Sequence, residues 1–168
     1  MHTRELANYG NVTGTTYTGG VIGKMEASST TVRNLLNGGN VTLRELAKLD
    51  RQTRYDIVDY LRDCPLYEAI TVNRRDYILV HAGFENFSPD RKLRDYSADE
   101  LIWAEPELKD EYFESIHTVF GHTPTVLFGK EYDGKIVRTR TWTCIDCGAA
   151  LGNEPILLRL DDGKEFKL

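Results

Sequence analysis

The sequence predicts an α/β fold whose central strands run parallel. Residues 77–80, Tyr-Ile-Leu-Val, are apolar at every position, as in a strand that is covered on both faces. Residues 118–120, Thr-Val-Phe, form a second such run. Between them, Ser97 and Glu100 make a capping box, which predicts the start of a helix through Trp103. Strand, helix and strand in this order predict a βαβ unit, which leaves its two strands parallel.

The chain before this unit is predicted to hold a loop-like segment and two helices. Half of the 14 glycines fall within residues 1–40, so we expect this Gly/Thr-rich segment to be only partly ordered. Thr42 and Glu45 form another capping box, which predicts that a short helix starts there. A second helix is expected from about Thr53. It should end before Pro65, because proline restricts the preceding residue and has no amide to donate.

The chain after the unit is predicted to form strands joined by tight turns. The expected strands are residues 135–140, 141–145, 156–160 and 165–168. The last two flank Asp-Asp-Gly-Lys at 161–164, which is a hairpin signal.

Composition and charge exclude several classes of function. The 168 residues carry 21 basic and 26 acidic side chains, and no basic cluster is longer than Arg74-Arg75, so we expect no nucleic-acid partner. No stretch approaches the roughly 20 apolar residues of a spanning helix, so we expect no membrane association and a cytoplasmic location. The three cysteines cannot all pair, which suits a reducing compartment.

Two of the four histidines directly follow the predicted parallel strands. These are His81 and His122, and the carboxyl ends of parallel strands are where open α/β sheets place ligand sites. Neutral imidazole is the commonest nitrogen ligand of first-row divalent metals. The pair therefore predicts a metal site. The alternative is that each ring bonds a nearby backbone group and stiffens a loop.

Five motifs, taken together and in order, resemble a known family. They are Asn37-Gly38-Gly39, the strand into His81-Ala82-Gly83, Leu101-Ile102-Trp103, Phe120-Gly121-His122-Thr123-Pro124 and Ile145-Asp146-Cys147-Gly148. This series resembles the C-terminal half of bacterial metal-dependent phosphoprotein phosphatases, in the calcineurin-like metallophosphoesterase superfamily. The resemblance implies that residues 41–168 form a partial sandwich of mixed sheets flanked by helices, without the N-terminal βαβ units.

The resemblance also implies a function. Such enzymes are serine/threonine protein phosphatase-like hydrolases, which cleave phosphate monoesters of a phosphorylated protein or a small phosphoester. Intact members hold two divalent ions, such as Mn, Fe, Zn or Ni, which activate the nucleophile and neutralise phosphoryl charge. The histidines that match His81 and His122 ligate one of these ions, so we expect both to be metal ligands and assign no catalytic residue. Dinucleotide polyphosphate hydrolases are a related alternative.

The chain departs from the family in its first three motifs, Gly-Asp-x-His-Gly, Gly-Asp-x-x-Asp-Arg-Gly and Gly-Asn-His-Glu. No glycine is followed by aspartate, and no Gly-Asn continues with histidine. The sequence thus resembles a member that lacks about seventy N-terminal residues. We expect one weakly held ion at most and little or no activity from this chain alone. Exposed sheet edges then predict a homo-oligomer. A non-catalytic binding module derived from a phosphatase is an alternative.

Phosphate recognition is a second departure. Bacterial members commonly place an arginine shortly after the tryptophan of the central segment, whereas Trp103 is followed here by Ala-Glu-Pro. Arg91 and Arg94 are possible substitutes, because the planar guanidinium suits phosphate. The alternative is that both are solvated surface residues.

The two late cysteines suggest a further alternative. Cys144 and Cys147 could ligate zinc together with His117 and His122, as in a small Cys-His zinc protein. Alternating strand faces argue against this, because they point the two thiols to opposite sides. Asp146 lies between the cysteines, and a structural role is predicted for it.

Overall fold

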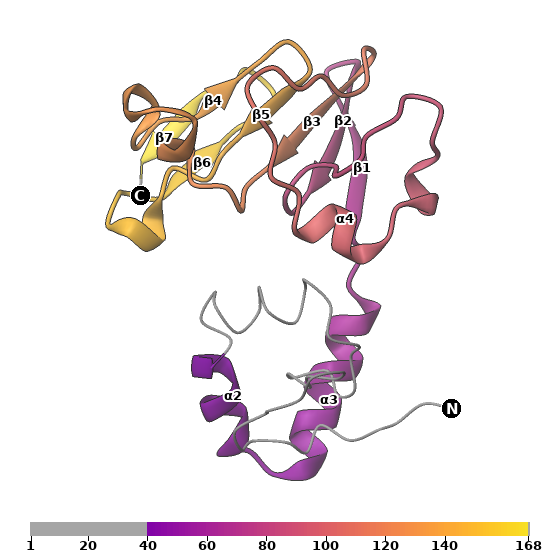
Figure 1. Ribbon diagram of the computed structural model, residues 1–168, viewed down its shortest axis with the longest axis vertical. Helices are drawn as coiled ribbons and strands as arrows, with labels where there is room; N and C mark the ends of the chain where they lie inside the picture. The colour runs from indigo at the N-terminus through magenta and orange to yellow at the C-terminus, as the bar shows by residue number, and fades with distance from the viewer. Residues whose placement is uncertain (1–39, 168) are drawn as a thin grey trace. The chain divides into compact units, whose positions relative to one another are not determined.

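The computed structural model describes residues 40–167, which divide into two compact units between Cys64 and Pro65 (Figure 1). The predicted loop-like segment 1–40 lies outside the described residues except for its last residue, and so does the Asn37-Gly38-Gly39 motif. In the described part of the chain, no helix combines the length and the apolar character that crossing a bilayer requires.

The first unit contains helix α2 (Asn40–Ala47). The prediction that Thr42 caps this helix is wrong, because the helix already includes Asn40 and Thr42 is its third residue. Glu45, the other member of the predicted capping box, instead forms an ion pair with Lys48, whose Nζ donates to its carboxylate at 2.6 Å.

Helix α3 (Arg51–Asp63) follows in the same unit. Asp50 caps it, since its carboxylate accepts the backbone N–H of Thr53 at 3.0 Å and the Thr53 hydroxyl at 2.6 Å. The predicted start at Thr53 is therefore two residues late, because the aspartate provides the cap. The helix ends before Pro65, as predicted.

The second unit is built on a five-stranded sheet with the order β1-β2-β3-β5-β4. Its strands are β1 (Tyr67–Val72), β2 (Arg75–Val80), β3 (Ile116–Phe120), β4 (Val137–Arg138) and β5 (Trp142–Cys144). The central β2, β3 and β5 are parallel, whereas β1 and β4 run antiparallel to their neighbours. The α/β class and the parallel centre are confirmed, and the strands predicted over 135–140 and 141–145 are shorter than expected.

Strand β1 was not predicted. It forms a hairpin with β2 through Asn73 and Arg74, whose φ angles of 50° and 67° match a type I′ turn. A glycine usually occupies such a turn, and its absence removed the local signal. The strand formers Tyr67, Ile70 and Val72 were the signal that remained.

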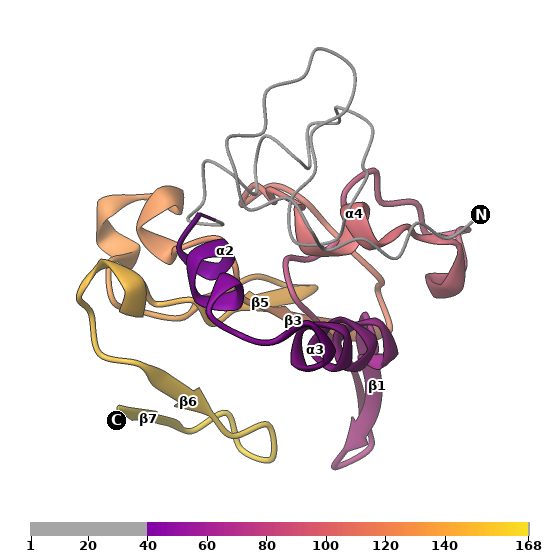
Figure 2. The same cartoon turned by 90° about the horizontal axis from the view of Figure 1, so that it is seen from below.

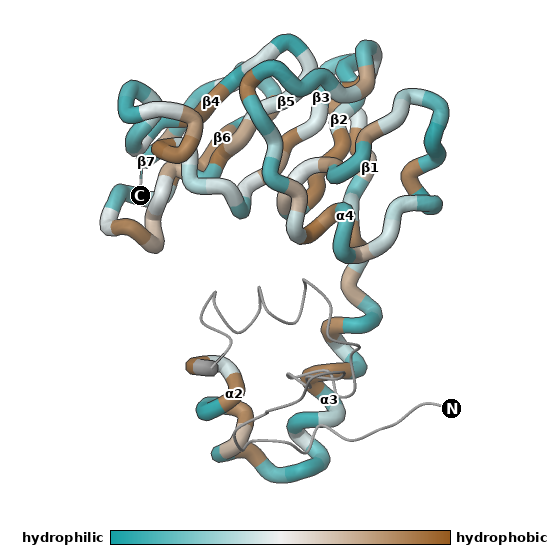
Figure 3. Tube along the Cα trace, in the orientation of Figure 1, coloured by the Kyte–Doolittle hydropathy of each residue, from teal (hydrophilic) through white to brown (hydrophobic). Residues whose placement is uncertain are grey.

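The core lies between the sheet and helix α4 (Ala98–Ile102), which connects β2 to β3 as the predicted βαβ unit requires. The Ser97–Glu100 capping box is present as predicted. Ile78, Phe120 and Trp142 are almost fully buried on the face of the sheet that α4 covers. Hydrophobic residues accordingly occupy parts of β2, β3 and α4 (Figure 3).

A second sheet lies on the face of the five-stranded sheet that α4 does not cover. It is the predicted hairpin, in the form of β6 (Ile156–Leu158) and β7 (Glu165–Lys167), and Figure 2 shows α4 and this hairpin on either side of the five-stranded sheet. Short 3-10 helices complete the unit: η2 (Leu93–Asp95), η3 (Thr125–Phe128), η4 (Lys130–Tyr132) and η5 (Ala149–Leu151).

Candidate metal centre

The three parallel strands end at the same level of the sheet. His81 follows β2, Gly121 and His122 follow β3, and Asp146 lies just after β5. The ladder continues past the strands, because the N–H of Gly121 donates to the carbonyl of His81 at 2.9 Å. This continued pairing fixes the two histidine backbones side by side.

The structure brings the two predicted ligands together. Nε2 of His81 lies 3.0 Å from Nδ1 of His122, and the ring centroids are 4.8 Å apart. His81 is exposed and His122 is half-buried. The His122 ring also meets Trp103 edge-to-face at 5.4 Å, which restricts its orientation.

The geometry of the pair fits two ligands of one ion. Zinc–imidazole bonds are about 2.0–2.1 Å long, so two ring nitrogens that are 3.0 Å apart are close enough to hold one divalent ion between them. In this structure the two nitrogens are hydrogen-bonded, so one of them donates. A bound ion would require both to be deprotonated, with the protons on His81 Nδ1 and His122 Nε2.

Backbone conformation aims His122 at its partner. Its φ of 64° is left-handed, and the following Thr123 N–H donates to the Gly121 carbonyl at 2.7 Å in a tight turn. A residue other than glycine in this region costs about 1–3 kcal/mol, and such strain gathers at functional sites.

Gly83 sets the loop after His81. Its φ is 101°, and an added Cβ would lie 2.7 Å from the hydroxyl oxygen of Tyr112. That hydroxyl accepts the N–H of Phe84 at 3.2 Å, and burial raises the pKa of Tyr112 to about 12. No sequence pattern indicates the role of Tyr112, because its partners are distant in the chain and only the fold brings them together.

Asp146 is hydrogen-bonded to the loops around it. Its carboxylate accepts the N–H of Gly148 at 3.0 Å, and its carbonyl accepts the N–H of Thr125 at 2.8 Å. Within residues 40–167, no group of three or more His, Cys, Asp and Glu side chains gathers in a metal-binding arrangement. In the described part of the chain, His81 and His122 therefore face one another without a third such side chain beside them.

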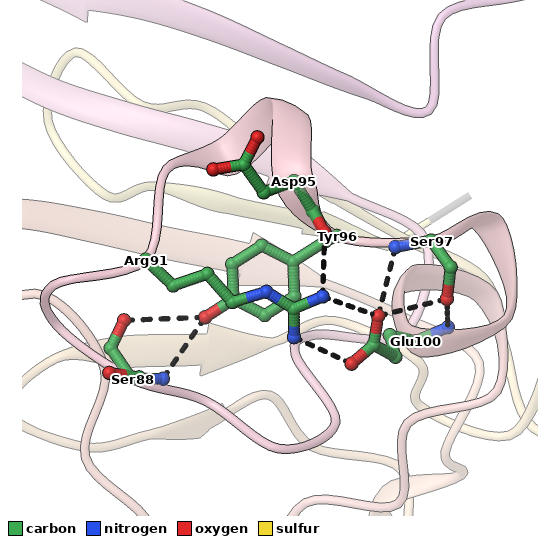
Figure 4. A network of polar contacts seen from close by, with 6 residues as sticks. All are labelled: Ser88, Arg91, Asp95, Tyr96, Ser97 and Glu100. Atoms are coloured by element: carbon green, nitrogen blue, oxygen red, sulfur yellow. Dashed lines mark hydrogen bonds and ion pairs between the residues drawn. The ribbon is translucent and has the colours of Figure 1, made fainter.

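Arg91 is engaged elsewhere, which makes it a poor phosphate ligand. Its guanidinium donates to both oxygens of Glu100, at 2.6 and 2.8 Å, and to the carbonyl of Asp95 at 2.6 Å (Figure 4). It also stacks on the Tyr96 ring at 4.0 Å. These hydrogen bonds lower the pKa of Glu100 to about 2. Arg94 is a solvated residue 3.9 Å from an Asp95 oxygen.

The residues of the zinc-protein alternative have other roles. His117 accepts a hydrogen bond from Arg75 at its Nδ1 and pairs with the Thr143 hydroxyl through Nε2, and burial lowers its pKa to about 4. Cys144 and Cys147 are buried, and burial raises the pKa of both thiols, that of Cys144 to about 12. Such thiols are poorly suited to bind zinc, which requires the thiolate.

No family model matches the chain, and a search of curated proteins finds no relative. The resemblance therefore depends on the five sequence motifs, of which four lie within the described residues. Three of these four follow β2, β3 and β5 at one edge of the sheet. The fourth contains Trp103, whose ring contacts His122.

Proposed function

We propose that this chain provides two imidazole ligands to one divalent ion of a metal-dependent phosphoesterase, of the serine/threonine protein phosphatase kind. The observation that carries the proposal is the 3.0 Å separation of His81 Nε2 and His122 Nδ1 beyond two adjacent parallel strands. The second sheet, opposite α4, supports a partial calcineurin-like sandwich as the fold. The substrate would be a phosphorylated protein or a small phosphoester.

The residues of the chain hold and orient the ligand pair. The Ala82 N–H donates to the Leu101 carbonyl at 3.0 Å, which ties the loop after His81 to helix α4. Trp103 ends the same helix and packs its ring against His122. When bound, a divalent ion would supply Lewis-acid stabilisation to phosphoryl oxygens.

Weak metal binding follows from the ligand types. Two neutral imidazoles bring no negative charge to offset that of the cation, and the acidic family motifs are missing from this sequence. We expect one Mn, Fe, Zn or Ni ion per chain at most, and little or no hydrolysis of para-nitrophenyl phosphate by this chain alone.

A calorimetric titration of the full chain with Mn²⁺ tests the proposal. We expect one ion per chain, and His81→Ala or His122→Ala should each weaken binding at least about tenfold, which is ~1.4 kcal/mol. His117→Gln is the matched control, because His117 is hydrogen-bonded to Arg75 and Thr143 instead, and it should leave the affinity unchanged. Binding that survives both site substitutions, or that is lost on Cys147→Ala, would overturn the proposal.

An activity assay on the same proteins distinguishes a non-catalytic binding module from an active phosphoesterase. Metal binding without phosphoester turnover favours the non-catalytic module derived from a phosphatase. Turnover by the Mn-loaded chain that disappears with His81→Ala contradicts the expectation of low activity and favours an active enzyme.

We also propose that the chain self-associates through sheet edges. Strand β1 pairs only with β2 among the described strands, so its outer edge presents unpaired backbone groups. The two-stranded β6–β7 sheet has such edges as well, and Leu157 on β6 is 56% exposed.

A further inference from the structure

A groove of about 490 Å³ lies on the face of the five-stranded sheet opposite α4. The strands contribute Arg75, Tyr77, His117 and Val119 to one wall, and Leu158 and Asp161 of the β6–β7 hairpin lie on the other. Arg75 begins β2, whereas His81 follows its end. Six residues of extended chain span about 20 Å, so the Arg75 end of the groove lies far from the histidine pair.

Arg75 is held in place from two sides. Its Nη2 donates to Nδ1 of His117 at 2.9 Å, and its guanidinium lies 5.4 Å from the centre of the Tyr77 ring. The His117 ring is itself fixed, because its other nitrogen pairs with the Thr143 hydroxyl at 2.8 Å. The guanidinium is thus oriented before any ligand arrives, which lowers the entropic cost of binding.

His117 must be neutral for this arrangement. An arginine can only donate, so Nδ1 of His117 has to accept and carries no proton. Burial, and next the charge of Arg75, lower the pKa of His117 to about 4, so the ring stays neutral at physiological pH.

Within residues 40–167, Arg75 makes no ion pair with a carboxylate. By contrast, Arg138, which also lines the groove, pairs with Glu165 at 2.5 Å. A guanidinium has five N–H donors arranged to match a carboxylate, and His117 uses one of them. Arg75 therefore has donors left for an anionic group.

The residues that line the groove favour a ligand with a single negative charge and an apolar chain. Asp161 and Asp162 both line the groove, and Asp162 pairs with Arg159. The charge of Asp161 remains, and it disfavours a doubly charged phosphate more than a single carboxylate. Val119 and Leu158 provide apolar surface on the two walls. The volume lies within the range of about 300–1,000 Å³ that is typical of small-molecule sites.

We propose that this groove binds a small monocarboxylate with an apolar body. The carboxylate pairs with the free N–H groups of Arg75, and the apolar body lies between Val119 and Leu158. This site is independent of the proposed metal centre.

NMR titration of the isotope-labelled full chain with sodium hexanoate tests this site. We expect saturable shifts of the Thr143 amide and the His117 ring, and binding at least about tenfold weaker in Arg75→Ala. Arg94→Ala removes an exposed arginine away from the groove and should leave the affinity unchanged. Arg75→Lys keeps the charge but loses the planar fork, and should bind with reduced affinity.

Two matched probes identify what is recognised. Hexan-1-ol has the same apolar body without the charge, and hexyl phosphate replaces the carboxylate with a dianion. Hexanoate should bind more tightly than either. Equal binding of hexan-1-ol, tighter binding of hexyl phosphate, or hexanoate affinity unchanged in both well-folded Arg75 variants would overturn the proposal.

Discussion

Replacing Gly83 with alanine tests how the loop after His81 is held. The substitution has two costs, because φ is 101° and the new Cβ would lie 2.7 Å from the Tyr112 hydroxyl oxygen. A strained backbone costs about 1–3 kcal/mol, and steric overlap in a packed region costs about 1–3 kcal/mol more. We therefore expect the free energy of unfolding to fall by about 2–6 kcal/mol.

Gly152→Ala separates these two costs. Gly152 has the same φ of 101°, but an added Cβ would meet nothing within 4 Å, so only the backbone term remains. Urea unfolding of the two variants should show Gly83→Ala to be the less stable by about 1–3 kcal/mol. Adding Tyr112→Phe to Gly83→Ala should recover part of the loss. Equal costs for the two glycines, or strict additivity with Tyr112→Phe, would refute the reasoning.

Three further predictions concern other parts of the molecule. Glu100→Gln should destabilise the fold by about 1.5–3 kcal/mol. Arg91 lowers the pKa of Glu100 from 4.5 to about 2, so the ion pair contributes fully above pH 4.5 and its contribution is lost as the pH falls toward 2. Urea unfolding at several pH values should therefore show that the free energy of unfolding of the variant falls less steeply in acid. Ellman's reagent should label the exposed Cys64 quickly and the buried Cys144 only as the fold opens; equal labelling rates would contradict this. Light scattering should detect a dimer or larger assembly, and a monomer at high concentration would contradict self-association through sheet edges.

Local signals explain most of what the sequence predicted. The apolar runs over 77–80 and 118–120 became the parallel β2 and β3, because a strand that is buried on both faces has little room for polar residues. The Ser97–Glu100 capping box predicted α4 because its two side chains pair with backbone N–H groups at the start of the helix. Since the carboxyl ends of parallel strands meet at one edge, the approach of His81 and His122 followed from these elements.

Other features depend on contacts between residues that are distant in the chain. Strand β1 was missed because its turn at Asn73 and Arg74 has no glycine and its buried and exposed residues do not alternate strictly. No sequence pattern predicts that Arg91 pairs with Glu100 or that Tyr112 contacts Gly83. Such pairings arise only when the loops fold over the sheet.

The central claim is that His81 and His122 hold one divalent ion jointly. Ring-nitrogen NMR of the full chain during a Zn²⁺ titration measures this most directly. The signals of His81 Nε2 and His122 Nδ1 should shift together and saturate at one ion per chain, while those of His117 stay in place, and His122→Ala should abolish the His81 response. Independent titration of the two rings, or no response of either, would contradict the claim.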